Sequence, residues 1–380
     1  MTLRIGVDAR TILLEKPTGV ERVAHHFIES LSRIAPAHQE FRFYVDREPG
    51  ARRDAAPDVD YEVVPDRSGP LRALGDFWMA WTMRGVMERD GLDAFLSLNT
   101  KFPFSRKPCF TAVHGLEWYF CPAEYRLAER VRQWTWFQLS TRYCSGLITF
   151  AEHTREDIRR VRPTSTVPTC VVPEGIHPLF RRLGADERSP AALERLGVRA
   201  PYVLSVCSHE PRKNLDALIR AFARAVTEHD LPHQLALVGR AGHGSRRLDE
   251  AIAQSGAGDR VLRTGYVSDE DLLQIYNHAD LFVYPSKYEG FGLPLVEAMA
   301  CGVAIVTSNT SSMKEVAGDA AVLIDPHSER DLQDGLARCL TDRALRERLA
   351  EAGTARSSAF TWDGMTRGIC DFLDERLGAR

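Results

Sequence analysis

The chain has 380 residues, of which 44% are hydrophobic and 27% are charged. This length exceeds what one hydrophobic core usually serves, so two domains of roughly 150 to 200 residues each are expected. The formal net charge of −3 gives no bulk reason to expect nucleic acid as a partner, and the absence of an uncharged apolar run of about 18 residues argues against a membrane-spanning helix.

The N-terminus and the cysteines indicate a cytoplasmic protein. The first ten residues carry charges at Arg4 and Asp8 and lack the apolar block of a secretory signal. The 8 cysteines are scattered without a C-x-x-C pair, which argues against a zinc site or a redox motif. We therefore expect reduced cysteines and a cytoplasmic location.

Strand and helix patterns alternate along the first half of the chain. Residues 3–7 are typical of a buried strand, and a loop through 17–19 leads into an amphipathic helix over 20–31. Further strands are predicted at 41–45, 94–98, 110–113, 147–150 and 169–172, with helical stretches between several of them. This alternation predicts a parallel sheet covered by helices.

Residues 173–200 carry three prolines and many charges, and the alternation then begins again. The fold class is therefore α/β, with two doubly wound, Rossmann-like domains. Neither half has a G-x-G-x-x-G after its first strand, which argues against a dinucleotide-dependent dehydrogenase. In the second half, strands are predicted at 202–206, 235–238, 281–284, 303–307 and 322–324, and helices near 214–229, 268–279, 294–301 and 328–352.

The loop over 287–294 follows a buried strand and contains two glycines. Ligands in open α/β sheets bind at the carboxyl ends of the strands, where such loops lie. Pro294 is predicted at the first helical position, so the amides of Gly292 and Leu293 would point from a helix N-terminus. Together with the helix dipole, these amides form an anion site suited to a pyrophosphate.

Two glutamates stand eight positions apart around this turn, at 289 and 297. An ionised carboxylate accepts hydrogen bonds from sugar hydroxyls, so we place Glu297 on the ribose. Glu289 would lie nearer the reacting sugar, where it could bind hydroxyls or stabilise positive charge at the anomeric carbon. The alternative is that both are surface carboxylates that cap a helix.

The string E-G-F-G-L-P-L-V-E, residues 289–297, resembles the E-x7-E signature of retaining glycosyltransferases of family 4. The resemblance continues through 298–302 and 315–319, and it implies the GT-B fold, in which two Rossmann-like domains face a central cleft. It also implies that Gly290 and Phe291 contact the donor along with the loop residues named above. The implied domains are an acceptor-binding domain over 1–180, completed by a C-terminal helix at 362–380, and a domain over 181–361 that binds a nucleotide-sugar donor.

A second cluster, Ser208-His-Glu-Pro-Arg-Lys-Asn, follows the first strand of the second half. Its last residue, Asn214, is expected to cap the next helix. Arg212 and Lys213 could neutralise a departing diphosphate and replace a divalent metal, although a solvated turn is the alternative. The string resembles the donor-phosphate loop of the family, in which Lys213 matches the basic residue, but Cys207 stands where an arginine is usual.

The loop over 264–267 precedes a capping-box arrangement at 268–271. In the family this loop lies beside the nucleotide base, which makes Tyr266 and Val267 the candidates for contact with the base. The string 18–22 resembles the glycine-rich first loop of the family, and Thr18, Gly19 and Val20 are implied to approach the donor.

His114 follows the strand predicted at 110–113. A histidine at such a position is commonly structural, but its match to a family segment implies a place near the donor sugar. The helix predicted over 71–87 carries Trp78 and Trp81 with flanking arginines, and we hypothesise that it rests on the inner membrane. The other aromatic side chains are expected mostly in the cores.

These features together predict a retaining, metal-independent hexosyltransferase without a cofactor, in which Arg212, Lys213 and the Gly292 and Leu293 amides stabilise the leaving diphosphate. GDP-mannose is the favoured donor, because the I-G-V-D-A-R opening and the E-P-R-K-N loop resemble bacterial mannosyltransferases of surface-polysaccharide assembly. The acceptor is expected to be a glycan or a lipid-linked saccharide. The alternatives are a UDP-sugar donor, a GT-B nucleotide-sugar epimerase, and a catalytically inactive nucleotide-sugar-binding protein.

Overall fold

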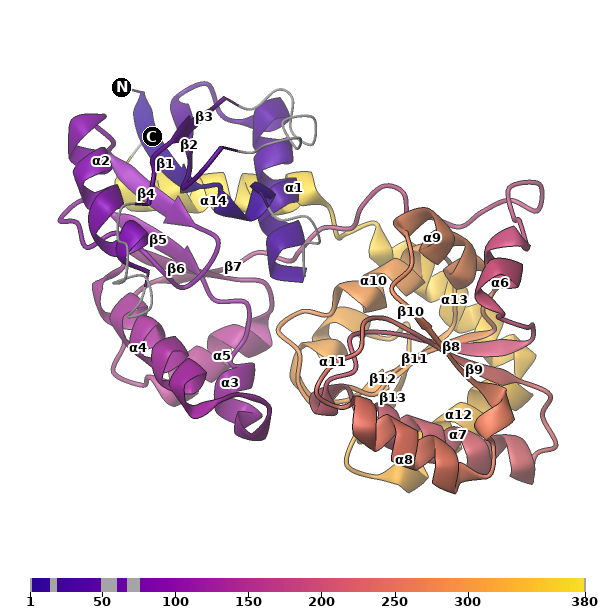
Figure 1. The fold of residues 1–380 in the computed structure, drawn as a ribbon. Helices are drawn as coiled ribbons and strands as arrows, with labels where there is room; N and C mark the ends of the chain where they lie inside the picture. The colour runs from indigo at the N-terminus through magenta and orange to yellow at the C-terminus, as the bar shows by residue number, and fades with distance from the viewer. Residues whose placement is uncertain (1, 14–18, 49–59, 67–75, 379–380) are drawn as a thin grey trace. The chain divides into compact units, whose positions relative to one another are not determined.

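The computed structural model describes the chain except residues 1, 14–18, 49–59, 67–75 and 379–380. The chain forms two compact units (Figure 1). Unit 1 comprises Met1–Tyr119, Tyr125–Gly175 and Thr361–Arg380, and unit 2 comprises Phe120–Glu124 and Ile176–Phe360. The units therefore divide after 175 and after 360, where the sequence analysis placed the boundaries after 180 and after 361.

Unit 1 is built on a seven-stranded parallel sheet in the order β3-β2-β1-β4-β5-β6-β7. Strand β3 was not predicted, because none of its three residues is buried and its middle residue, Glu62, is charged and exposed. The strand order reverses at β1, which pairs with β2 on one side and β4 on the other. The strands are β1 Leu3–Asp8, β2 Gln39–Val45, β3 Tyr61–Val63, β4 Ala94–Ser97, β5 Cys109–Ala112, β6 Gly146–Thr149 and β7 Thr169–Val171.

The helices of unit 1 bury one face each against this sheet or against one another. In α1, for example, the buried side chains Val23, Phe27 and Leu31 recur every four residues, which is the spacing of an amphipathic helix. The helices are α1 Gly19–Ile34, α2 Met83–Arg89, α3 Glu117–Phe120, α4 Leu127–Tyr143, α5 Glu152–Val161 and α14 Trp362–Leu377, and the last residue of α3 is assigned to unit 2.

Helix α14, at the C-terminal end of the chain, packs on α1 and belongs to unit 1. The Trp362 ring stacks on His26 with ring centroids 4.7 Å apart, and Ser30 Oγ donates to Asp363 Oδ1 at 2.6 Å. Near the other end of the helix, Gln39 Nε2 donates to Asp374 Oδ1 at 2.6 Å. These contacts place the last helix in the same unit as the first strand.

Unit 2 has a six-stranded parallel sheet in the order β10-β9-β8-β11-β12-β13, and its order reverses at β8. The strands are β8 Tyr202–Val206, β9 Gln234–Val238, β10 Val261–Gly265, β11 Leu281–Tyr284, β12 Ile305–Ser308 and β13 Val322–Ile324. The helices are α6 Ala191–Leu196, α7 Leu215–Glu228, α8 Ser245–Ser255, α9 Asp269–His278, α10 Leu293–Ala300, α11 Ser311–Ala317, α12 Glu329–Thr341 and α13 Arg343–Ser357.

The single helix predicted over 328–352 is wrong, because the chain breaks at Asp342 into α12 and α13. Asp342 has an extended backbone, and its side chain accepts a hydrogen bond from Leu345 N at 2.9 Å. An aspartate that satisfies an amide of the following turn starts a new helix even where the apolar pattern continues.

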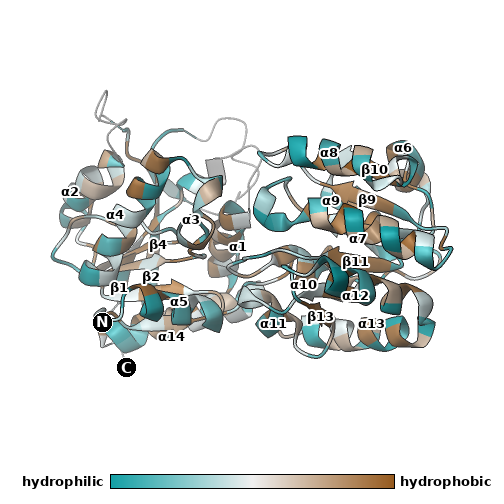
Figure 2. Cartoon of the chain, turned by 90° about the horizontal axis from the view of Figure 1, so that it is seen from below, coloured by the Kyte–Doolittle hydropathy of each residue, from teal (hydrophilic) through white to brown (hydrophobic). Residues whose placement is uncertain are grey.

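The core of each unit lies between its sheet and the covering helices. In Figure 2 the strands are mostly brown, whereas the helices carry teal residues. Strand β11 is buried along its whole length, as expected for a parallel strand covered on both faces. Among the described residues, no helix is both long and apolar enough to cross a membrane.

Candidate functional site

The point where the strand order of unit 2 reverses, between β8 and β11, is the place where open α/β sheets bind ligands. The loops that leave these two strands are joined there. Lys287 N donates to the carbonyl oxygen of Arg212 at 2.8 Å, and Ser286 Oγ lies 3.2 Å from the same oxygen. The structure thus brings the two sequence clusters, 208–214 and 287–294, into one site.

Glu289 is the centre of this site and is only 6% exposed. Arg212 Nη1 also donates to the carbonyl oxygen of Tyr288 at 3.0 Å, which fixes the guanidinium relative to the loop. Three side chains donate to the Oε1 atom of Glu289: Arg212 Nη1 at 2.7 Å, Lys213 Nζ at 2.5 Å and Ser286 Oγ at 2.6 Å.

The charges of this cluster determine its protonation. Burial acts to raise the pKa of Glu289, but the Arg212 guanidinium and the Lys213 ammonium outweigh it and lower that pKa to about 2. Burial and the nearby Arg212 lower the pKa of Lys213, while Glu289 opposes them. Glu124 Oε2 also lies 3.8 Å from Arg212 Nε and offsets part of the positive charge that the two cationic groups leave beside Glu289. The N–H groups of Arg212 and Lys213 nevertheless remain suitable donors to an anionic ligand.

Tyr284 completes the cluster from the end of β11. Its hydroxyl oxygen accepts a hydrogen bond from Lys213 Nζ at 2.7 Å. Burial and the Glu289 carboxylate raise the pKa of Tyr284 well above its ordinary value, so the phenol stays neutral. Tyr284 and Glu289 together use two of the three N–H bonds of the Lys213 ammonium.

The glycine loop turns directly into α10. Gly292 has φ of +100°, a conformation that favours glycine, and it stands immediately before the first helical residue, Leu293. Pro294 is therefore the second residue of the helix, one position later than predicted. In the described chain, the amides of Gly292 and Leu293 have no backbone acceptor, so they are available at the positive end of the helix dipole.

Glu297 lies within α10 and is 6% exposed, as Glu289 is. Its Oε2 atom accepts a hydrogen bond from the Tyr276 hydroxyl at 3.0 Å. Burial and the Glu297 charge raise the pKa of Tyr276 well above its ordinary value, so the tyrosine acts as a neutral donor. The alternative reading of Glu289 and Glu297 as surface carboxylates is wrong, because both side chains are buried.

The loop over 207–214 corrects two details of the prediction. Asn214 does not cap α7 with its side chain, because its φ of 61° turns the amide toward Pro326, whose carbonyl oxygen accepts from Asn214 Nδ2 at 2.8 Å. Cys207 is buried, and burial raises the pKa of its thiol to about 11. The uncharged thiol does not supply the charge of the arginine usual in the family.

The proposed base loop lies after β10, and only part of it is exposed. Val267 is 7% exposed, whereas Tyr266 is 56% exposed and lies under the guanidinium of Arg240, whose Cζ atom is 5.0 Å from the ring centroid. The tyrosine ring is thus the accessible aromatic surface of this loop. Arg240 follows β9, and its contact with Tyr266 across two strand ends was not foreseen.

In unit 1, Gly19 and Val20 form the first residues of α1, while Thr18 lies outside the described residues. A Cβ atom at Gly19 would meet no atom within 4 Å. The packing of the chain itself therefore does not require glycine at this position, in contrast to the backbone conformation at Gly292.

His114 follows β5, at the carboxyl edge of the sheet of unit 1. Its Nε2 atom lies 2.9 Å from the carbonyl oxygen of Leu98, and its Nδ1 atom lies 3.6 Å from Glu174 Oε1. Because a carbonyl only accepts hydrogen bonds, Nε2 carries the hydrogen. The structure thus gives this imidazole a partner inside unit 1 at each nitrogen.

A cavity of about 850 Å³ lies at the carboxyl edge of the same sheet. Its wall includes Arg10, which pairs with Asp8 Oδ2 at 2.9 Å and with Asp76 Oδ2 at 3.0 Å. Lys101 Nζ pairs with Asp76 Oδ2 at 3.1 Å from the other side, and Trp136 supplies an aromatic surface. The sequence analysis did not identify this group, although Arg10 stands in the I-G-V-D-A-R opening.

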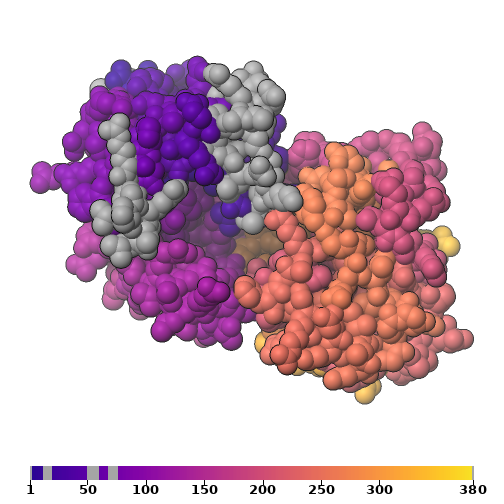
Figure 3. All heavy atoms as spheres, in the orientation of Figure 1, coloured from indigo at the N-terminus to yellow at the C-terminus, as the bar shows by residue number. Residues whose placement is uncertain are grey.

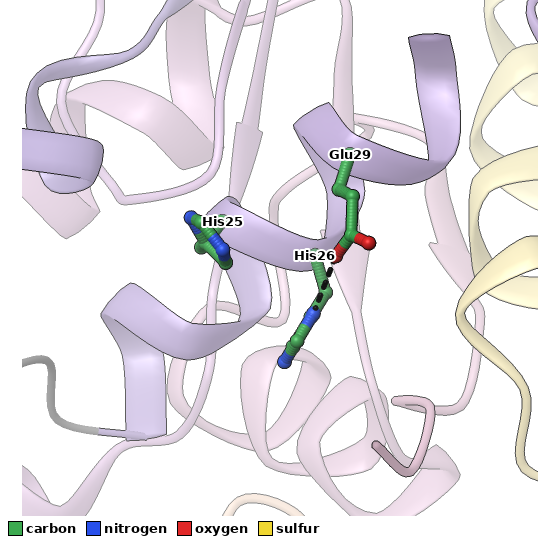
Figure 4. Close-up of side chains that lie close together, drawn as sticks. All are labelled: His25, His26 and Glu29. Carbon is green, nitrogen blue, oxygen red and sulfur yellow. Dashed lines mark hydrogen bonds and ion pairs between the residues drawn. The ribbon is translucent and has the colours of Figure 1, made fainter. Parts of the chain in front are cut away.

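Among the described residues, one group of three side chains has the composition of a metal site: His25, His26 and Glu29 on α1. Figure 4 shows His26 and Glu29 joined by a hydrogen bond, whose two atoms are 3.1 Å apart, while His25 takes no part in it. One possible ligand atom of each side chain lies within 4.8 Å of the others, and the two imidazole rings meet edge to face with centroids 5.4 Å apart. His26 also contributes to the stacking of α14 on α1 described above.

The comparison with family models decides the assignment. The model for glycosyl transferases group 1 matches residues 194–356, and the model for Glycosyltransferase Family 4 matches residues 17–178. The chain belongs to glycosyltransferase family 4. Its E-x7-E loop and its two parallel sheets are those of the family, as the sequence predicted.

Relatives and solved structures agree with this membership. The family 4 chain is 38% identical to O-antigen chain mannosyltransferase B of Escherichia coli over 165 residues, which are 43% of each chain. The match thus spans less than half the length of that relative. The fold is GT-B. Sucrose-phosphate synthase from Thermosynechococcus elongatus superposes over 100% of both chains with a TM-score of 0.76 at 20% identity. Anabaena HepE in complex with UDP and glucose superposes over 98% of this chain and 100% of its own, with a TM-score of 0.76 at 18% identity.

Proposed function

We propose that the chain is a retaining, metal-independent hexosyltransferase that transfers mannose from GDP-mannose to a glycan or a lipid-linked saccharide. The observation that carries the proposal is the buried cluster of Arg212, Lys213 and Glu289 beside the α10 N-terminus. Such a cluster has the charge and the backbone donors that a sugar diphosphate needs. Residues 181–361 then bind the donor and residues 1–180 bind the acceptor.

Each side chain has one role in this mechanism. Lys213, Arg212 and the amides of Gly292 and Leu293 stabilise the diphosphate as the anomeric C–O bond breaks. The departing phosphate oxygen removes the proton of the incoming hydroxyl, which attacks from the same face, so the configuration is retained and no enzyme-bound sugar forms. Glu289, ionised and held by three donors, stabilises positive charge at the anomeric carbon.

The remaining donor contacts follow from exposure and position. Glu297, oriented by Tyr276, accepts hydrogen bonds from the ribose hydroxyls, and Tyr266 offers its exposed ring to the base. Gly290 and Phe291 line the loop. In unit 1, His114, Thr18, Gly19 and Val20 are proposed to approach the donor sugar and phosphates.

Metal independence is proposed because two side-chain cations and a helix N-terminus already offset the diphosphate charge. Asp-x-Asp strings, the spacing of many metal-binding carboxylates, occur at 58–60 and 269–271, and in the second of them Asp271 forms an ion pair with Arg195. Transfer rates in excess EDTA that equal the rates with magnesium would agree with the proposal. A requirement for a divalent ion would contradict it.

The donor assignment rests on the likeness to the Escherichia coli O-antigen mannosyltransferase, and the HepE complex with UDP makes a UDP-sugar the second candidate. Thermal unfolding in the presence of GDP-mannose, GDP, UDP-glucose and UDP separates them, because a ligand that binds the native state raises the midpoint by mass action. Stabilisation by the UDP compounds alone would leave the mechanism in place and replace the donor.

The acceptor is proposed to enter the cavity of unit 1, where Trp136, Asp76 and Arg10 combine an aromatic face with charged hydrogen-bonding groups. Saccharide sites commonly combine groups of these two kinds. Since bacterial surface saccharides can be assembled on lipids, we also propose peripheral contact with the cytoplasmic face of the membrane.

Transfer itself is tested with Lys213→Ala. Removal of a transition-state donor of this kind lowers kcat by about 10² to 10³ fold. Lys287→Ala changes a lysine of the neighbouring loop whose side chain forms no part of the Glu289 cluster, so it is the matched control and should keep kcat within about twofold. Equal rates for both variants would remove Lys213 from the mechanism.

Product analysis separates the two other candidate functions. A GT-B epimerase would convert the nucleotide sugar without an acceptor, and an inactive binding protein would be stabilised by the donor without turnover. An α-linked product formed from the α-linked donor, read from the anomeric NMR signals of the new glycosidic bond, is the outcome expected for the retaining transferase.

A further inference from the structure

Helix α4 has two apolar faces, and only one of them is covered. Trp136 and Phe137 are 8% and 0% exposed and pack into unit 1. On another face, Leu127, Val131 and Trp134 are 72%, 56% and 38% exposed. Their spacing of four and three residues places them along one side of the helix. Apolar side chains gathered along one exposed face mark a site of interaction, so the second face of α4 is suited to a partner.

Side chains of α3 extend this face into a shallow groove of about 230 Å³. The Tyr119 and Trp134 rings stack at 18° with centroids 6.0 Å apart, and Tyr119 is 45% exposed. In Figure 1 α3 and α4 lie at the edge of unit 1, and the spheres of this part of the chain form open surface in Figure 3. We call the groove residues the α3–α4 patch: Trp118, Tyr119, Leu127, Arg130, Val131 and Trp134.

The charges around the α3–α4 patch are mainly positive. The segment from the residue before α4 to its last turn contains four arginines and one acidic residue, Glu129, and α3 adds Glu117. Arg126 and Arg132 line the cavity of about 850 Å³ together with Glu129, whereas Arg130 lies within the α3–α4 patch. At the far end of the helix, Arg142 lies over the ring of Tyr143, which is 62% exposed. The four arginines are Arg126, Arg130, Arg132 and Arg142.

We propose that the α3–α4 patch docks on an anionic lipid bilayer. Aromatic rings and aliphatic side chains enter the boundary between headgroups and acyl chains, while arginines bind the lipid phosphates. A glycan fits less well, because the groove is almost wholly apolar and sugar hydroxyls need polar partners. This inference rests on the peripheral membrane contact proposed above and gives that contact a surface.

The position of the patch connects it to the proposed acceptor site. Val131 lines both the groove and the cavity of about 850 Å³, so α4 forms a common wall between an apolar and a polar compartment. A bilayer on the patch would hold the headgroup region beside the cavity. The polar end of a lipid-linked saccharide would then reach the cavity without leaving the membrane surface.

The helix predicted over 71–87, which was hypothesised to contact the membrane, differs from α4 in how its aromatic side chains are exposed. Of its two tryptophans, Trp78 is 1% exposed and its Nε1 atom donates to the carbonyl oxygen of Val64 at 2.6 Å. Trp81, at 52%, is exposed. The first residues of the hypothesised segment, 71–75, lie outside the described part of the chain.

The test is flotation of the full chain with vesicles, either of phosphatidylcholine alone or with about a third phosphatidylglycerol. Binding should occur to the anionic vesicles only and should weaken as salt screens the arginines. Leu127→Glu places an anion at the most exposed apolar position and should reduce the bound fraction at least about tenfold. Trp81→Glu, an equally drastic change at an exposed aromatic position outside the patch, should bind like the unaltered chain.

Several outcomes would overturn the proposal: no binding to anionic vesicles, equal binding to both kinds of vesicle, or unchanged binding of Leu127→Glu. Concentration-dependent dimers without vesicles that Leu127→Glu abolishes would also overturn it, since they would assign the patch to a second copy of the chain. Because Leu127 is so exposed, its variant should unfold at the unaltered midpoint. Donor binding measured without vesicles tests the proposed function separately, so either proposal can fail alone.

Discussion

The two units place similar charge clusters at the carboxyl edges of their sheets, near the strand at which the order reverses. In unit 2, Glu289 binds Arg212 and Lys213, and in unit 1, Asp76 binds Arg10 and Lys101. The Lys213 side chain is 9% exposed, however, whereas that of Lys101 is 35% exposed and lies against a cavity. The clusters thus differ at their lysines, whereas the side chains of Arg10 and Asp76, at 19% and 10% exposed, are nearly as buried as those of Arg212 and Glu289, at 16% and 8%.

This difference separates a preformed site from an adaptable one. A buried cluster with fixed donors loses little entropy when it binds a diphosphate, and its electrostatic effect is not screened by water. A cluster that lines a cavity is partly solvated, so its groups can exchange water for the hydroxyls of different saccharides. The donor side would then be rigid and the acceptor side permissive.

The largest expected effect is that of Glu289→Gln. The amide keeps the shape but removes the carboxylate that lies between two buried cations, so the free energy of unfolding should fall by about 3 to 5 kcal/mol. The matched variant in unit 1 is Asp76→Asn, which should lose less, about 2 kcal/mol, because Lys101 is partly solvated although Arg10 is nearly as buried as Arg212. Urea unfolding of both variants measures the contrast, and equal losses would show that the clusters do not differ in the way described.

The pH dependence of stability sharpens the same contrast. The pKa of Glu289 falls from an ordinary 4.5 to about 2 on folding. A lowered pKa stabilises the native state at pH values above the ordinary pKa, and this stabilisation is lost as the pH falls toward 2. The difference in unfolding free energy between the unaltered chain and Glu289→Gln should therefore be constant from pH 7 to about 5 and should shrink by about 3 kcal/mol toward pH 2. A constant difference down to pH 3 would contradict the assigned pKa.

A smaller difference in unfolding free energy between the units is expected when one glycine of each is replaced. Gly292→Ala forces a side chain into the left-handed region and should lower the unfolding free energy by about 1 to 2 kcal/mol. Gly19→Ala, where a Cβ atom meets nothing, should change it by less than about 0.5 kcal/mol. If Gly19→Ala nevertheless lowers donor affinity, a ligand rather than the protein requires the glycine.

The smallest effect is expected for Tyr276→Phe, which removes the hydrogen bond to Glu297. Stability should fall by about 1 kcal/mol. Donor KM should rise more than kcat falls, because Glu297 is proposed to bind the ribose and not the reacting carbon. A lower kcat at unchanged KM would place Glu297 nearer to the chemical step.

Much of the fold was predictable from the sequence because both sheets are parallel. Buried strands such as β11 produce continuous apolar runs, and the helices between them carry the period of an amphipathic helix. Short strands escaped prediction for the opposite reason. Strands β3 and β10 have few fully buried residues, and polar side chains interrupt their pattern.

Part of the candidate site was also predictable, since the positions of Arg212, Lys213 and the glycine loop follow from strand ends. The pairing of side chains within the site was not predictable. Arg212 and Glu289 are 77 positions apart, and no local pattern shows that one oxygen of Glu289 receives three donors. The same holds for Tyr276 with Glu297 and for Asn214, whose side chain binds a distant carbonyl instead of its own helix.

Helix α14 makes unit 1 discontinuous along the chain, and this has a consequence for biogenesis. A ribosome completes all of unit 2 before it releases the helix that covers α1. Domains tend to fold as they emerge, N-terminal first. Unit 1 therefore cannot complete its folding, and His26 and Ser30 stay uncovered, until unit 2 has been translated. The unit that is synthesised first is thus the one that completes its folding last.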